Sequence, residues 1–386
     1  MIDLGTETNR LVAVLRAPER AETLSTAHWS SLVATARATN LIGALADKLA
    51  AHGAPVPPPA ARHLAGALQL AARQRLSVQW EAHCLQRALG SLGVPVVLLK
   101  GAAYVMAPGN LGRGRMFGDI DVLVPRDALG EVESALMLDG WVSAKTDAYD
   151  QRYYRQWMHE IPPMTHIRRG TVIDVHHTIL PLTARNAPDP AQIIARCAPV
   201  PGLPALRVPA PQDLLIHSVT HLVHEGELHN GLRDLHDIDS MLRGFGSEAD
   251  FWSRLVANAA GNDLAGPLVL GLRLARAAFD SPVPEAALAT LDAAAAPRWR
   301  RAWLQAAYAY ALRPPTRAGA GTRAMAARSA VYIRSHALRM PLPMLLRHLS
   351  IKAWKGLTRR DAETTAPAPA TPTAATRIDA SAPRPP

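Results

Sequence analysis

Residues 94–125 constrain the fold more than any other part of this chain. They begin with a short apolar run, residues 96–99, which predicts a buried strand. A Lys-Gly turn and a short helix follow, and a second apolar run then carries Asp119 and Asp121. Because side chains at alternate positions of a strand share one face, these two carboxylates should stand side by side. We expect the intervening isoleucine and the two valines that follow at alternate positions to be buried on the opposite face.

Two neighbouring carboxylates repel each other, and a divalent cation commonly offsets that repulsion. A ligand set made only of oxygen favours Mg²⁺ or Mn²⁺. The arrangement is therefore typical of a site for phosphoryl or nucleotidyl transfer. An acidic pair on a solvent-exposed strand edge is the alternative, and the apolar residues on either side argue against it.

A third carboxylate, Asp174, is expected to join the pair. Residues 171–178 alternate in polarity and predict a strand that carries Asp174. The Arg-Arg-Gly sequence at residues 168–170 predicts a hairpin turn directly before it. We therefore expect the hairpin to bring Asp174 next to Asp119 and Asp121.

The rest of the chain is predicted to be mostly helical, so the fold class is α/β (α+β), a small mixed-sheet core with large helical portions. In the first portion we expect helices at 26–50 and 60–92, whose polar residues, including Arg75 and Glu81, form a solvated face. In the core we expect a helix at 126–138, a strand within 153–167, and a proline-rich connection at 181–210 with one short helix. The predicted regions are an N-terminal helical region at 1–92, the α/β core at 93–210, a C-terminal helical region at 211–357 and a disordered tail at 358–386.

Composition limits the partners and the compartment. The formal net charge is +10, which indicates either affinity for polyanions or an arginine-rich codon bias. The two cysteines, Cys84 and Cys197, are far apart in the sequence and fit a reducing compartment. The first residues are acidic and do not resemble a signal peptide, and no apolar run approaches the roughly 20 residues of a membrane span. We therefore expect a cytoplasmic protein.

The ordered motifs resemble those of a known family. They are Leu-Lys-Gly at residues 99–101, Arg115, Asp-Ile-Asp-Val-Leu-Val at residues 119–124 and Ile-Asp-Val-His at residues 173–176. Together they look like the uncharacterised bacterial nucleotidyltransferase family of the DNA polymerase β-like nucleotidyltransferase superfamily. The resemblance covers roughly residues 94–241, including a helical segment with the sequence DLLIHSVTHLVHEG.

The resemblance implies Mg²⁺- or Mn²⁺-dependent transfer of a nucleoside monophosphate from an NTP to a hydroxyl group of a small molecule, a biosynthetic intermediate or a protein. Carried over by position, the catalytic and metal-binding residues are Asp119, Asp121 and Asp174, and the nucleotide-binding residues are Lys100, Gly101 and Arg115. One departure is that Ala102 follows Gly101, where the superfamily commonly has serine or glycine. The hydroxyl that often touches the γ-phosphate in the superfamily is therefore missing here.

Alternative functions remain open from the sequence. His217 and His221 have a spacing able to bind zinc, but no HExxH motif accompanies them. One competing interpretation is that these polar residues only pack within the helices. Another is that His221 or Asp234 contacts the substrate. The chain could be a catalytically silent nucleotide-binding module. The C-terminal helices could instead bind nucleic acid or an anionic membrane surface through interleaved basic and aromatic residues, which are Arg298, Trp299, Arg300, Arg301, Trp303, Arg323, Arg328, Tyr332, Arg334, Arg339, Arg347, Lys352, Trp354 and Lys355.

Overall fold

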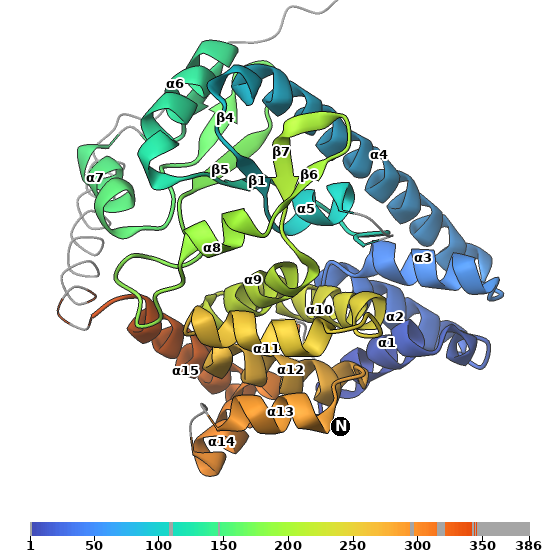
Figure 1. Cartoon of the computed structure of the whole chain (residues 1–386). Helices are drawn as coiled ribbons and strands as arrows, with labels where there is room; N and C mark the ends of the chain where they lie inside the picture. Colours follow the sequence, from blue (N-terminus) through green and yellow to red (C-terminus); the bar gives the residue numbers. More distant parts are fainter. Residues whose placement is uncertain are drawn as a thin grey trace, which may run out of the picture. The chain divides into compact units, whose positions relative to one another are not determined.

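The computed structural model describes residues 2–107, 111–145, 147–293, 297–314 and 321–341, together with Pro343 and Leu345. Residues Met1–Pro341 form one compact unit, and Leu342–Pro386 form a second. The predicted disordered tail at 358–386 and the basic residues from Arg347 onward lie outside the described residues. The account below concerns the first unit, which Figure 1 shows with its elements labelled.

Among the described residues, seven strands form one mixed sheet in the order β3-β4-β5-β2-β1-β7-β6 (Figure 1). This sheet with helices around it confirms the mixed α/β class expected from the sequence. The strands are β1 Val96–Leu98, β2 Ile120–Leu123, β3 Trp141–Ser143, β4 Met164–His166, β5 Val172–His176, β6 Ala198–Val200 and β7 Leu203–Val208.

The centre of the sheet consists of β5, β2, β1 and β7. Strand β2 runs antiparallel to β1 and parallel to β5, and β1 is also parallel to β7. Every residue of β1 and β2 is buried, as the apolar runs predict. Strands β6 and β7 were missed in the connection at 181–210, because Pro199 and Pro204 disfavour a strand when the sequence is considered alone. Pairing with β1 makes β7 a strand.

Four helices precede the sheet: α1 Thr6–Arg16, α2 Thr26–Ala38, α3 Ile42–His52 and α4 Pro58–Leu89. The expected single helix at 26–50 is two helices, because the chain turns at Asn40, which has a positive φ of 55°. Helix α4 has 32 residues and runs alongside the sheet (Figure 1). It begins with prolines in its first turn, where the missing N–H has no intrahelical partner to lose.

The expected solvated face of α4 is partly wrong. Glu81 is only 4% exposed, and its carboxylate accepts hydrogen bonds from Arg169 and Thr171 of the β4–β5 turn. Arg75 donates to the backbone carbonyls of Val105 and Leu111. Polar side chains of α4 therefore attach this helix to the segments that carry the candidate site.

Four helices lie among the strands in sequence: α5 Lys100–Met106, α6 Leu129–Asp139, α7 Ala148–Trp157 and α8 Pro190–Ala195. The strand expected within 153–167 is shorter than predicted, because α7 occupies its first part and only β4 follows. Aromatic residues favour strands, but Asp147 caps α7 by accepting from the N–H groups of Tyr149 and Asp150. The N-cap outweighs the strand preference of the aromatic residues.

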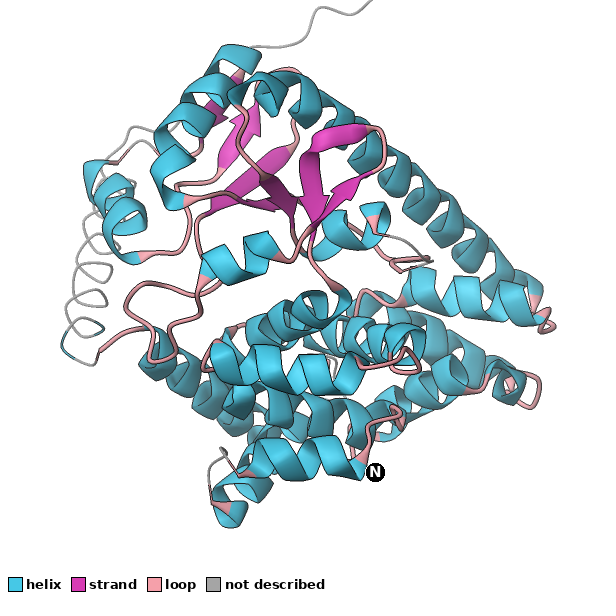
Figure 2. Ribbon diagram, in the orientation of Figure 1, coloured by secondary structure: helices cyan, strands magenta, loops and turns pink. Residues whose placement is uncertain are grey.

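The remaining helices follow the sheet, and the cyan ribbons below the magenta strands in Figure 2 show how much of the unit they form. Helix α9 packs against α10, α11, α12 and α15, and α1 from the N-terminal portion contacts α12. The helical portions before and after the sheet therefore touch each other. These helices are α9 Pro211–His224, α10 Gly231–Phe245, α11 Phe251–Gly261, α12 Ala265–Phe279, α13 Glu285–Asp292, α14 Arg298–Ala311 and α15 Thr322–Arg339. Short 3-10 helices are Pro18–Ala21, Gly90–Leu92, Arg126–Ala128 and Leu228–Asn230.

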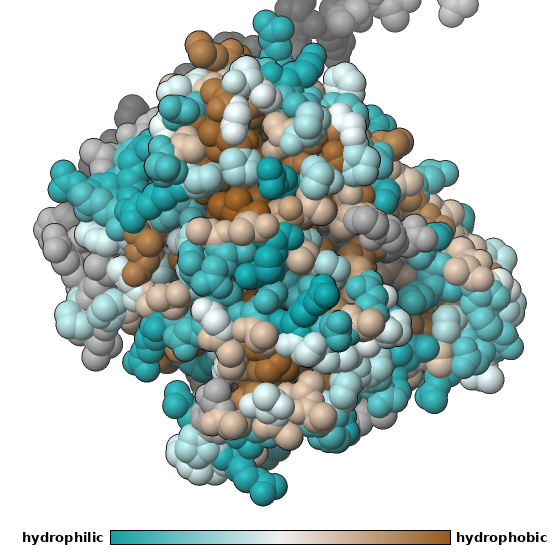
Figure 3. Space-filling view, in the orientation of Figure 1, coloured by the Kyte–Doolittle hydropathy of each residue, from teal (hydrophilic) through white to brown (hydrophobic). Residues whose placement is uncertain are grey.

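The surface is mixed. On the face drawn in Figure 3, hydrophilic residues cover most of the area and apolar patches are small and separate. Within the described ranges, no helix combines the length and the apolar character that crossing a bilayer requires.

Candidate functional site

The candidate site lies on the paired strands β2 and β5. Asp121 and Asp174 are register partners in this parallel pair, and partners in parallel strands present their side chains on the same face. Asp119 is the residue directly before β2, two positions from Asp121. The structure therefore places the three predicted carboxylates together at the β2–β5 pair in the centre of the sheet. The hairpin expected before Asp174 is formed by β4 and β5, but Asp174 comes next to Asp121 because β5 pairs with β2 in parallel.

Asp121 is the most enclosed member of this group, with a side chain that is 3% exposed. Its Oδ1 atom accepts a hydrogen bond from Lys100 Nζ at 2.6 Å and lies 3.1 Å from His176 Nε2. Burial by itself raises the pKa of Asp121, but the Lys100 ammonium and the His176 hydrogen bond together hold that pKa well below its usual range. Asp121 is therefore ionised in the folded protein.

Lys100 is positioned by an unusual backbone. Its φ of 42° lies in the left-handed region, which residues with a Cβ rarely adopt. This conformation occurs at the junction of β1 with the first residue of α5. Burial lowers the pKa of Lys100, but Asp121 more than compensates and raises it overall. The ammonium therefore remains charged beside the carboxylates.

Asp174 differs from Asp121 in its electrostatics. Its Oδ1 atom is buried and makes no hydrogen bond. Burial, followed by repulsion from Glu160 and Asp121, raises the pKa of Asp174 to about 7. Burial and the charge of Asp121 also raise the pKa of Asp119. Lys100 and Arg115 act in the opposite direction on Asp119, and His176 does so on Asp174, but neither effect offsets the rise in pKa.

Arg115 is held by helix α10, where its Nε donates to Asp237 Oδ2 at 2.7 Å. Its guanidinium lies over the rings of Tyr104 and Phe117, 5.3 and 5.2 Å from their centroids. A Cβ on Gly101 would lie 2.7 Å from Arg115 Nη1, so the absence of a side chain at Gly101 makes room for this arginine.

Histidines of α9 face the same region. Burial, followed by the charges of Lys100 and His176, lowers the pKa of His217 to about 3. Burial and Lys100 also lower the pKa of His221 well below its usual range. His221 Nε2 lies 3.5 Å from Glu225 Oε2 on the same helix. Both histidines are therefore neutral, and the helix that carries them lies close enough to sense the charges of the site.

Two residues near the site were missed by sequence reasoning. His159 and Glu160 lie between α7 and β4, and Glu160 forms an isolated β-bridge with His176. His176 Nδ1 lies 3.3 Å from Glu160 Oε2. His159 and Glu160 belong to no recognisable motif, and they were assigned to a continuous strand, so the sequence contained no signal for their position.

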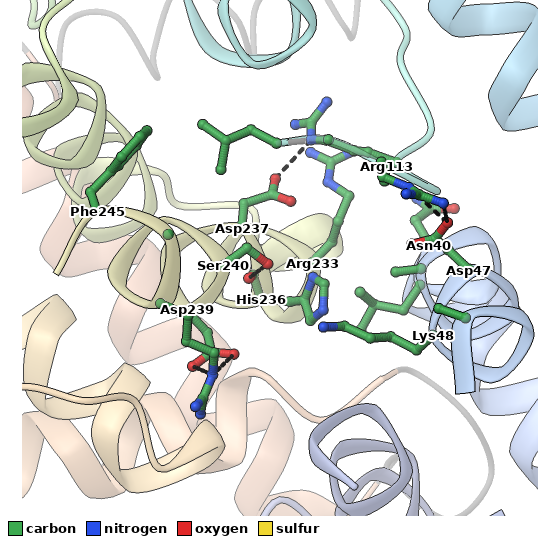
Figure 4. Close-up of a pocket in the computed structure, with 18 of the residues that line it drawn as sticks. Asn40, Asp47, Lys48, Arg113, Arg233, His236, Asp237, Asp239, Ser240 and Phe245 are labelled. Carbon is green, nitrogen blue, oxygen red and sulfur yellow. Dashed lines mark hydrogen bonds and ion pairs between the residues drawn. The ribbon is translucent and has the colours of Figure 1, made fainter. Parts of the chain in front are cut away.

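A pocket of ≈ 550 Å³ shares Arg115 with the candidate site and is lined by residues of α3, the segment before β2 and α10. The three carboxylates do not line it. Figure 4 shows Arg113 beside Asp47 on one wall, with Arg233 and Asp237 projecting from α10. Its arginines form ion pairs, which are Arg113–Asp47, Arg115–Asp237, Arg233–Asp234 and Arg243–Asp239. The charges of these side chains are therefore largely neutralised by one another.

The basic C-terminal helices present a less uniform surface than the sequence suggests. Trp299 and Trp303 of α14 are 74% and 52% exposed. Arg334 of α15 instead points inward, where it donates to the carbonyl of Val223 and to the hydroxyl of Tyr308. At least one arginine of the expected nucleic-acid-binding set therefore has a structural role.

A mixed sheet with acidic residues on two neighbouring strands, surrounded by helices, defines an α/β protein with a candidate cation- and phosphate-binding site. The family described as "Uncharacterised nucleotidyltransferase" matches residues 25–280. The chain belongs to this family, as its motifs led us to expect. The match extends beyond the predicted residues 94–241 in both directions, so the family includes α2, α3 and α4 as well as the helices through α12.

Other comparisons add little. The crystal structure of an antigenic nucleotidyltransferase-like protein from Paracoccidioides brasiliensis is similar at 13% sequence identity and a TM-score of 0.29. The similarity covers 55% of this chain and 95% of that chain. The comparison with curated proteins gave no match.

Proposed function

We propose that this protein is a Mg²⁺- or Mn²⁺-dependent nucleotidyltransferase that moves a nucleoside monophosphate from an NTP to a hydroxyl group. The observation that carries the proposal is the register of β2 and β5, which sets Asp121 directly beside Asp174. Membership of a nucleotidyltransferase family supports the same reaction class.

The donor atoms fit a hard divalent cation. Asp119, Asp121 and Asp174 offer only oxygen, and one oxygen of Asp174 is buried without a partner. Such an atom is costly unless something binds it, and oxygen ligands suit Mg²⁺ and Mn²⁺. We therefore assign these three residues as the cation ligands. When bound, the ion supplies charge stabilisation to the triphosphate and the departing pyrophosphate.

The side chains around the carboxylates have separate roles in this proposal. Lys100 and Arg115 provide positive charge for phosphate groups. The Lys100 ammonium lies beside Asp121, and the Arg115 guanidinium lies over the ring of Tyr104. Asp174, as the carboxylate that pairs in register with Asp121, can accept the proton of the attacking hydroxyl. Gly101 keeps the backbone at the start of α5 open beside them. The acceptor itself is a small molecule, a biosynthetic intermediate or a protein.

Thermal shift with each of the four NTPs, with and without Mg²⁺, tests the proposal. We expect the wild-type melting temperature to rise by roughly 3–5 °C at a hundredfold excess of NTP over Kd, only when Mg²⁺ is present. Asp174→Asn is the most informative variant, because it removes the charge of a proposed cation ligand and keeps the size of the side chain. It should keep the fold and lose the shift.

Asp127→Asn is the matched control, since Asp127 is an exposed aspartate a few residues after β2. It should behave as wild type. A shift that is independent of Mg²⁺, or that survives in Asp119→Asn and Asp174→Asn, would contradict the assigned site. The absence of any shift with every NTP would favour a catalytically silent module.

A further inference from the structure

A second group of donor atoms lies directly beside the carboxylates and includes nitrogen. His159, Glu160 and His176 each offer one donor atom, and these atoms all lie within 4.8 Å of one another. Glu160 Oε2 is 3.3 Å from His176 Nδ1 and 3.8 Å from His159 Nε2. Ligands bound tetrahedrally to a metal at about 2.1 Å are separated by about 3.4 Å. The observed spacings therefore need only small side-chain adjustments to hold an ion.

The Nδ1 atom of His176 has a carboxylate oxygen nearby but no hydrogen bond to it. His176 Nδ1 is buried and makes no hydrogen bond, even though Glu160 Oε2 is only 3.3 Å away. The oxygen must therefore lie off the axis of that nitrogen. Buried polar atoms are normally satisfied, so His176 Nδ1 indicates that the cluster is built for a further ligand.

The other nitrogen of His176 completes a familiar metal-site arrangement. His176 Nε2 lies 3.1 Å from Asp121 Oδ1, and an ionised carboxylate can only accept, so Nε2 is the donor. In the neutral ring Nδ1 then carries a lone pair. Histidines that bind metals commonly donate their second N–H to a carboxylate, which fixes the ring and raises its basicity. Asp121 has this role for His176.

The backbone holds the three donors in place. Glu160 bridges to His176, the N–H of His177 donates to the carbonyl of His159 at 2.8 Å, and the N–H of Ile161 donates to Val175 at 3.0 Å. The segment that carries His159 and Glu160 is therefore attached to the end of β5. The rings of His159 and His176 stack with their centroids 5.0 Å apart. Donors fixed on paired backbone lose little freedom when they bind an ion.

We propose that His159, Glu160 and His176 bind a first-row transition-metal ion, with Zn²⁺ as the reference ion. Two imidazoles and one carboxylate suit zinc and its neighbours better than Mg²⁺, which prefers oxygen alone. Three protein ligands leave a fourth coordination position open. This site is distinct from the oxygen-only site proposed for the NTP-bound cation and does not depend on nucleotidyl transfer.

The test uses the full chain, stripped with EDTA, incubated with equimolar Zn²⁺ and desalted before metal analysis. We expect one zinc ion per chain to be retained. Co²⁺ in place of Zn²⁺ should give visible d–d absorption of a nitrogen- and oxygen-bound ion. His159→Ala and Glu160→Gln should each weaken binding at least tenfold, and circular dichroism should show that both variants remain folded.

Two controls separate this site from its neighbours. His221→Gln removes the histidine with zinc-compatible spacing on α9 and should leave zinc retention unchanged. Asp119→Asn, which disables the proposed nucleotide site, should also retain zinc, so failure of the two proposals can be distinguished. The inference is overturned if wild type retains no zinc, because His176 then only bridges Asp121 and Glu160 through protons. It is equally overturned if His159→Ala and Glu160→Gln retain as much zinc as wild type.

Discussion

Lys100 Nζ lies 2.6 Å from Asp121 Oδ1, and the Asp121 side chain is 3% exposed whereas that of Lys100 is 24% exposed. The lysine therefore extends from the edge of solvent to a nearly enclosed carboxylate. It reaches that carboxylate from a backbone position with φ of 42°. The contact gives Asp121 its charge partner and places an ammonium beside the carboxylates of the candidate site.

Lys100→Met should destabilise the protein by about 3 kcal/mol, because it leaves the buried charge of Asp121 without its cation. The double variant Lys100→Met/Asp121→Asn should be more stable than Lys100→Met alone, since no buried charge then remains unpaired. Urea unfolding at neutral pH measures both. A double variant that is no more stable than Lys100→Met would show that the two residues are not energetically coupled.

Glu81→Ala should lower the free energy of unfolding by about 3 kcal/mol, because Arg169 and Thr171 lose a buried partner. Glu133→Ala is the matched control, since Glu133 pairs with Arg155, whose side chain is 45% exposed. That loss should stay below about 1 kcal/mol. Chemical denaturation of the two variants side by side provides the comparison, and similar losses would contradict the structural role assigned to α4.

Gly43→Ala should be poorly tolerated. A Cβ on Gly43 would lie 2.1 Å from the backbone oxygen of Gly114, and neither backbone can yield as a flexible side chain could. We expect a loss of about 3 kcal/mol. Gly66→Ala on α4 meets nothing within 4 Å and should instead stabilise by about 0.5–1 kcal/mol. If Gly43→Ala raises the melting temperature as Gly66→Ala should, then α3 does not lie as close to the segment before β2 as the structure shows.

Stability should fall in mild acid because of His224. Burial lowers the pKa of His224 to about 4, so the folded protein keeps this ring neutral while the unfolded chain protonates it near 6.5. Between these values the unfolded state binds more protons, so stability present above pH 6.5 is lost as pH falls toward 4. His224→Gln should reduce the loss between pH 7.5 and 5.5 by about 1 kcal/mol. His229→Gln, at a side chain that is 76% exposed, should leave the pH profile unchanged.

Local patterns were enough to predict the acidic strands and most helices. The alternation around Asp121 and Asp174 identified both strands, because burial on one face leaves a period of two in the sequence. Strand β7 escaped prediction because its formation depends on β1, about a hundred residues earlier. The pairing of Arg115 with α10 was not predicted, for the same reason. Its partner Asp237 lies far along the chain, and nothing near Arg115 indicates it.

The pairing of β1 with β7 also bears on how the chain is made. Val96 in β1 pairs with Leu206 in β7, so a nascent chain that has emerged only as far as β5 presents one edge of β1 without a partner. Exposed strand edges recruit other chains. Fragments that end before β7 should therefore aggregate more readily than the full chain, because β7 covers this edge of β1.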